Sequence, residues 1–138
     1  MPVQIFKGSL LPLLCLGAQA AEPIGFNRDV RPILSDKCFA CHGMDEETRE
    51  GKLRLDTPEG AFRKKRRGKA AIVPGKSEES GAWMRIISND EEEVMPPPES
   101  HKSLNDEEKA IIKRWIDEGA TYQKHWAFEA PVKAEVPA

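Results

Sequence analysis

Two thiols and an imidazole stand within five residues in the stretch Cys38-Phe39-Ala40-Cys41-His42, which decides how the rest of the chain is interpreted. If this segment is helical, Cys38 and Cys41 lie on one face, one turn apart, and can react with two neighbouring groups of one ligand. His42 follows directly and lies one turn from Cys38. This is the attachment pattern of c-type haem, in which the two cysteines form thioethers and the histidine approaches the iron.

Three other kinds of site could use the same residues. A structural zinc site needs four ligands, and the sequence has no second Cys or His pair at the usual spacing. A thioredoxin-like redox pair occurs in a βαβ context, which the pattern does not indicate. A disulfide between Cys38 and Cys41 would close a very small loop and leave His42 without a role. The sequence therefore favours one covalently bound haem, attached through Cys38 and Cys41, with His42 as the proximal ligand.

On the N-terminal side, residues 1–20 have the pattern of a secretory signal peptide. A positive charge at Lys7 is followed by an apolar stretch at 9–17 and by the small residues of a cleavage site. The apolar stretch is too short to span a bilayer, and no transmembrane segment follows. We expect cleavage near Ala21 and export to the periplasm or another compartment outside the cytoplasm. Cleavage would also remove Cys15, so only the motif cysteines would remain.

The charged residues are nearly balanced, with 21 basic and 23 acidic side chains and a formal net charge of -2. This balance gives no indication of a nucleic-acid-binding protein. The charges gather in a basic run at Arg63–Arg67 and an acidic run at Asp90–Glu93. These runs are either solvated loops or docking patches for an oppositely charged redox partner. The sequence identifies neither the partner protein nor the oligomeric state.

The apolar periodicity and the turn residues predict a small, mainly α domain, with room for one short β-hairpin. In chain order, the predicted elements are a helix from near Asp29 to His42, a short strand at Leu53–Leu55, a short helix at Glu59–Arg63, a second short strand at Ala70–Val73, a helix from Ser77 through Ile87, and a helix that Asn105 caps and Gly119 closes. The two strands would pair to form the hairpin. We expect a haem domain at 21–128 and a linker-like tail at 129–138.

Five side chains could supply the second axial ligand of the iron, namely Met44, Met84, Met95, His101 and His125. Met44 is too close in sequence to the proximal ligand to reach the opposite face of the haem. Met84 falls within the apolar pattern of a predicted helix, where packing in the core is the better interpretation. Met95 is distant in sequence, and the prolines at 96–98 restrict its loop. We favour Met95, with His101 next; a methionine that only fills a core gap is the alternative.

This ligand set has consequences for function. Ligation by His and Met raises the reduction potential relative to two histidines. An iron with six ligands has no open site, which indicates an electron carrier rather than an enzyme. A haem enzyme or gas sensor with a labile sixth ligand is the alternative, but the sequence shows no distal acid–base pair of the kind a peroxidase needs.

Several stretches resemble a known family. They are Phe26–Gly43, Leu53–Thr57, Ala71–Lys76, Val94–Pro98 and His125–Phe128. Together they resemble the planctomycete-type cytochrome c domain. The resemblance implies a small cytochrome c-like helical fold, haem attachment at Cys38 and Cys41, and axial ligation by His42 and Met95. Members of this family continue into large additional domains, so an N-terminal haem module of a larger protein is a further interpretation.

Two other residues are candidates for the haem pocket. Trp115 lies on the apolar stripe of the last predicted helix, where it packs either on the haem edge or in the ordinary core. Arg54 either pairs with a haem propionate or is an exposed charge on the first predicted strand.

Overall fold

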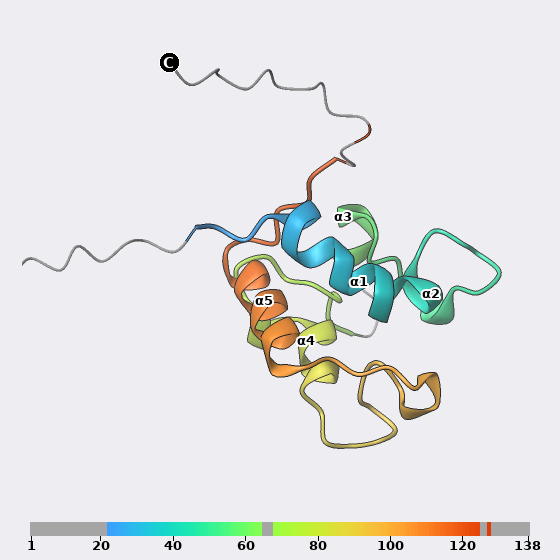
Figure 1. The fold of residues 1–138 in the computed structure, drawn as a ribbon. Helices are drawn as coiled ribbons and strands as arrows, with labels where there is room; N and C mark the ends of the chain where they lie inside the picture. The colour runs from blue at the N-terminus through green and yellow to red at the C-terminus, as the bar shows by residue number, and fades with distance from the viewer. Residues whose placement is uncertain (1–21, 65–67, 125–126, 128–138) are drawn as a thin grey trace, which may run out of the picture.

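The fold is known from a computed structural model that describes residues 22–64, 68–124 and 127 (Figure 1). Its helical elements in chain order are η1 (Phe26–Val30), α1 (Arg31–Lys37), α2 (Phe39–His42), η2 (Glu50–Lys52), α3 (Pro58–Ala61), η3 (Ser77–Glu79), α4 (Gly81–Ile86), η4 (Pro98–Ser100) and α5 (Asp106–Asp117). No strand forms among the described residues, so the predicted mainly α class is confirmed. The predicted signal peptide (1–20), the tail (129–138) and three residues of the basic run (65–67) lie outside the described residues.

Among the described residues, no helix combines the length and the apolar character that crossing a bilayer requires.

The N-terminal helix runs from η1 directly into α1. Its buried residues Phe26, Val30 and Ile33 recur at spacings of four and three, which places them on one face. The helix begins earlier than the predicted Asp29. The Asp29 carboxylate accepts the backbone N–H of Gly25 at 2.8 Å, so Asp29 stabilises the start of the helix from within its first turn. Pro32 lies in the first turn of α1, just after the point where η1 passes into α1.

Helix α5 packs against η1 and α4 (Figure 1). Asn105 caps it as predicted: Asn105 Oδ1 accepts the Glu108 N–H at 2.8 Å, and Glu108 Oε2 accepts the Asn105 N–H at 2.9 Å. This reciprocal capping box satisfies two N–H groups that a helix start otherwise leaves unbonded. Its buried residues, Ile112, Trp115 and Ile116, form the centre of the core.

The short β-hairpin does not form. In the segment at 70–73, Ile72 N–H donates to Ala61 O at 3.0 Å, while Ala70 O accepts from Gly81 N–H at 3.0 Å. In the segment at 53–55, Leu55 N–H donates to His42 O at 2.8 Å. The backbone groups of both segments form hydrogen bonds with residues at the ends of helices, and the two segments do not pair with each other. An alternating or apolar pattern over three or four residues does not distinguish a paired strand from a segment that bonds to the end of a helix.

The predicted helix from Ser77 is divided at Ser80 into η3 and α4, and Ser77 does not cap it. Trp83 and Ile86, three residues apart, face the core. Met84 and Ile87 face away from it and are 44% and 41% exposed. The expectation that Met84 packs in the core was therefore wrong, because a six-residue helix buries only one narrow face.

The segment after α5 returns to the N-terminal helix. The Tyr122 ring lies 4.4 Å from that of Phe26 and 5.2 Å from that of Trp115, measured between ring centroids. Asn27 Nδ2 donates to Lys124 O at 2.6 Å, which attaches the segment at a second point. These contacts close the core where the segment at 121–124 meets the N-terminal helix.

Candidate functional site

The Cys38–His42 motif spans the junction of α1 and α2. Cys38 interrupts the helix with φ -128° and ψ -39°, and its carbonyl accepts the N–H groups of Cys41 at 3.2 Å and His42 at 2.8 Å. These bonds place the three motif residues within one tight turn. The two thiols are free rather than joined in a disulfide; Cys41 is exposed and Cys38 is partly buried.

The environment of Cys38 differs from that of a redox-active thiol. Burial, reinforced by Asp36 and Cys41, raises the pKa of the Cys38 thiol to about 11. It is therefore protonated at neutral pH. A thioredoxin-like pair instead depends on a cysteine whose pKa is lowered, so the raised pKa of Cys38 does not favour the thioredoxin-like interpretation.

The chain turns sharply behind the motif at Gly43. A Cβ atom at this position would lie 2.4 Å from the carbonyl oxygen of Phe39, so only glycine fits. Arg49 then holds the turn: its Nε donates to Gly43 O at 2.9 Å and its Nη2 to Met44 O at 2.5 Å. The predicted end of the helix at Gly43 is confirmed, and its physical cause is this close approach of two backbone segments.

The segment at 53–55 supports the motif from another direction. Leu55 N–H donates to His42 O at 2.8 Å, and Leu55 O accepts the hydroxyl of Tyr122 at 2.9 Å. Since Tyr122 packs on the aromatic core, a continuous chain of contacts joins the core to the backbone of the motif histidine.

Arg54 lies beside this support but is already paired. Its Nε and Nη2 donate to the two carboxylate oxygens of Asp56 at 2.9 and 2.5 Å. The Arg54 hydrogen bond lowers the pKa of Asp56. A bidentate pair of this kind is strong and specific, so a role for Arg54 at a haem propionate stays a prediction, and the contacts favour a structural role.

Met95 lies in the loop that follows α4. It is partly buried, and its N–H donates to the carbonyl of Arg85, in the last turn of α4, at 3.1 Å. The exposed side chains of Met84 and Ile87 belong to this same end of α4. Of the other ligand candidates, Met44 is highly exposed, His101 lies on the surface after η4, and His125 lies outside the described residues.

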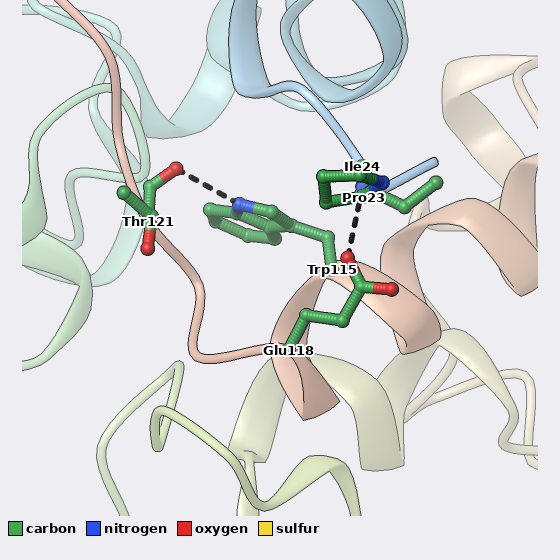
Figure 2. Close-up of a pocket in the computed structure, with 5 residues that line it drawn as sticks. All are labelled: Pro23, Ile24, Trp115, Glu118 and Thr121. Carbon is green, nitrogen blue, oxygen red and sulfur yellow. Dashed lines mark hydrogen bonds between the residues drawn. The ribbon is translucent and has the colours of Figure 1, made fainter. Parts of the chain in front are cut away.

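Trp115 is enclosed by the protein itself (Figure 2). Its side chain is 1% exposed, its ring lies 5.5 Å from that of Phe26, and its Nε1 donates to Thr121 O at 3.2 Å. A pocket of about 470 Å³ adjoins it, lined also by Pro23, Ile24, Glu118 and Thr121. No motif residue lines this pocket. These contacts favour core packing for Trp115, while a contact with the haem edge stays a prediction.

The donor set at the motif fits a haem better than a bare metal ion. No group of three or more His, Cys, Asp or Glu side chains that could hold a metal ion occurs in the described part of the chain. The motif offers two free thiols and one imidazole within one turn. Two thioethers and one axial nitrogen are what a covalently attached haem requires from one side.

Two polar residues that organise this region were not found from the sequence. Arg49 holds the turn after the motif, and Lys102 donates to Asp36 in the last turn of α1. Arg49 lies within a loop crowded with charged residues, and Lys102 is separated from Asp36 by 66 residues. No local pattern distinguishes either of them from a solvated surface charge.

The comparisons with known proteins agree with the motif. Residues 38–99 match the family described as Planctomycete cytochrome C, which confirms the resemblance. No curated protein and no solved structure matches the chain. The matched segment begins at Cys38 and includes Met95, whereas α1 and α5 lie outside it. The match supports a planctomycete-type cytochrome c domain in this part of the chain, and domains of that family are associated with haem binding and electron transfer.

Proposed function

We propose that this chain is an exported electron carrier with one covalently bound haem. Cys38 and Cys41 would hold the haem through thioethers, and His42 and Met95 would provide the two axial ligands. The observation that carries the proposal is the motif turn, in which the backbone N–H groups of Cys41 and His42 both donate to the carbonyl of Cys38. The two free thiols and the following imidazole therefore belong to one tight turn.

The chain's own residues have distinct roles in this proposal. Leu55 holds the carbonyl of His42 and Arg49 holds that of Gly43, so the backbone that follows the imidazole is fixed. The Met95 thioether is a weaker donor than an imidazole and favours the ferrous iron. When bound, the haem supplies a centre that gains and loses one electron. With His42 and Met95 both held for the iron, the chain would leave no open position at which a substrate could bind.

Export is supported by the signal-like residues 1–20 and by the family, whose domains typically lie outside the cytoplasm. The redox partner is a protein outside the cytoplasm whose identity is open. Fractionation of cells that produce the full chain would test the compartment: haem-loaded protein confined to the cytoplasm would contradict export.

The axial ligand is tested with Met95→Ala in the haem-loaded protein. The ferric wild type should show the sulfur-to-iron charge-transfer band, and the variant should lose it while the haem stays attached, because the thioether is the source of the band. Met84→Ala is the matched control, since Met84 lies on the adjacent helix α4 and is the other nearby thioether. Loss of the band in the control instead of in Met95→Ala would assign the ligand to Met84. Rapid binding of carbon monoxide to the reduced wild type would favour the labile-ligand alternative.

A further inference from the structure

The segment that carries Met95 is attached to the rest of the domain at both of its ends. At its start, the N–H of Met95 donates to Arg85 O in α4. At its far end, Lys102 reaches the last turn of α1, only two residues before Cys38. The segment therefore bridges α4 and the end of α1, and the second attachment lies next to the motif.

Lys102 makes two contacts with the same residue. Its Nζ donates to the Asp36 carboxylate at 2.8 Å and also to the Asp36 backbone carbonyl. Carbonyls in the last turn of a helix have no intrahelical partner, and a positive charge is favoured there. The ammonium group of Lys102 thus donates to a backbone carbonyl at the end of α1 and also pairs with the carboxylate of the same residue, Asp36.

The chain between the two attachments is stiff. Three successive prolines at 96–98 fix their φ angles. The turn η4 follows, in which Pro97 O accepts both the N–H of Ser100 at 2.9 Å and its hydroxyl at 2.7 Å. The N–H of Lys102 then donates to Ser100 Oγ at 3.3 Å. Because little freedom remains between Met95 and Lys102, the position of one constrains the other.

The contact of Lys102 with Asp36 is part of a larger network. Asp36 also pairs with Lys37 at 2.8 Å, and Lys37 Nζ lies 4.0 Å from Glu108, the residue that completes the capping box of α5. The side chains of Lys102 and Asp36 are 40% and 57% exposed, so an ordinary ion pair there would contribute little. The added bond to the helix carbonyl and the link to α5 distinguish this contact from a surface ion pair.

We propose that Lys102 is a positioning residue for the axial ligand: by attaching the Met95 segment to the end of α1, it limits the fraction of molecules in which Met95 is detached from the iron. This inference rests on the proposed function, in which Met95 is that ligand. Lys102 acts through the segment and not by contact with the haem.

Binding of imidazole to the ferric, haem-loaded full chain tests the inference. Imidazole competes with Met95, so its apparent affinity rises in proportion to the fraction of molecules in which the ligand is detached. Removal of a charge-assisted hydrogen bond in Lys102→Met should raise this apparent affinity about tenfold. Lys102→Arg retains the charge and its hydrogen-bond donors and should restore most of the wild-type value.

Lys76→Met is the matched control. It also removes one positive charge and a 2.8 Å ion pair, that with Glu79, but it lies away from the Met95 segment. Its imidazole affinity should equal that of the wild type, which would exclude a general effect of net charge.

Met95→Ala separates failure of the inference from failure of the proposed function. If Met95→Ala binds imidazole no more tightly than the wild type, Met95 is not the ligand and the proposed function is wrong at that point. If Met95→Ala binds much more tightly but Lys102→Met behaves like Lys76→Met, the ligand assignment holds and the positioning role of Lys102 is overturned. The inference is supported if the apparent imidazole affinity rises about tenfold in Lys102→Met and stays at the wild-type value in Lys76→Met.

Discussion

The two sides of this small domain are built in different ways. Where the N-terminal helix meets α5, which we call the helix interface, the core residues Phe26 and Trp115 are 2% and 1% exposed. At the end of α4, by contrast, Met84 and Ile87 are 44% and 41% exposed. We call this second region, together with the Cys38–His42 motif and the Met95 segment, the motif side.

The difference shows what each side depends on. The helix interface is closed by the chain's own aromatic rings and by the capping box of α5. The motif side is held mainly by hydrogen bonds to backbone carbonyls, donated by Arg49, Leu55 and Lys102. Substitutions at the helix interface should therefore change the free energy of unfolding, and substitutions on the motif side should change the haem environment as well.

The largest expected effect belongs to the helix interface. Trp115→Ala should lower the free energy of unfolding by about 3–5 kcal/mol, because it leaves a cavity among buried rings. The milder Trp115→Phe keeps most of the volume and allows the folded, haem-loaded protein to be studied. Denaturant unfolding gives the loss of stability, and the haem absorption spectrum of Trp115→Phe should match that of the wild type. A shifted spectrum would show instead that Trp115 contacts the haem.

An intermediate effect is expected on the motif side. Arg49→Met removes two hydrogen bonds from the carbonyls behind the motif, and hydrogen bonds from a charged donor contribute about 1.5–3 kcal/mol. The variant should unfold more easily and, unlike Trp115→Phe, should show a shifted reduction potential, because the turn after His42 loosens. Arg63→Met, which removes an exposed arginine, serves as the control and should stay within about 0.5 kcal/mol of the wild type. Equal reduction potentials in Arg49→Met, Arg63→Met and Trp115→Phe would contradict the distinction between the helix interface and the motif side.

The smallest effect concerns pH. The hydrogen bond from Lys102, followed by that from Lys37, lowers the pKa of Asp36 from 3.8 to about 2. A lowered carboxyl pKa stabilises the fold above the unfolded value, and this contribution disappears as the pH falls from 3.8 through about 2. The melting temperature of the wild type should therefore exceed that of Asp36→Asn by a constant amount near neutral pH. The difference should shrink between about pH 4 and pH 2; a pH-independent difference would exclude a contribution from ionised Asp36.

The features that the sequence predicted correctly are local. The capping of α5 by Asn105 and the end of the motif helix before Gly43 both depend on residues within about one turn of each other. The spacing of the motif is local in the same sense. Each of these signals acts through contacts that a short segment makes with itself.

The features that could not be predicted depend on the folded chain. The segment at 53–55 bonds to His42 rather than to a second strand, and this choice is made by tertiary packing. Met84 falls within the apolar pattern of its predicted helix, but α4 buries only Trp83 and Ile86. Lys102 and Asp36 meet across 66 residues, so nothing near either residue marks the contact. Which carbonyls, charges and rings a residue meets is decided only when the elements pack.

The central claim, covalent attachment of one haem at Cys38 and Cys41, is tested most directly by the intact mass of the denatured, exported protein, combined with a pyridine haemochrome assay on the same sample. We expect the mass of the polypeptide plus one haem, a haemochrome spectrum typical of haem c, and loss of both in the double variant Cys38→Ala/Cys41→Ala. The bare polypeptide mass, or haem that acidic solvent extracts from the wild type, would contradict the claim.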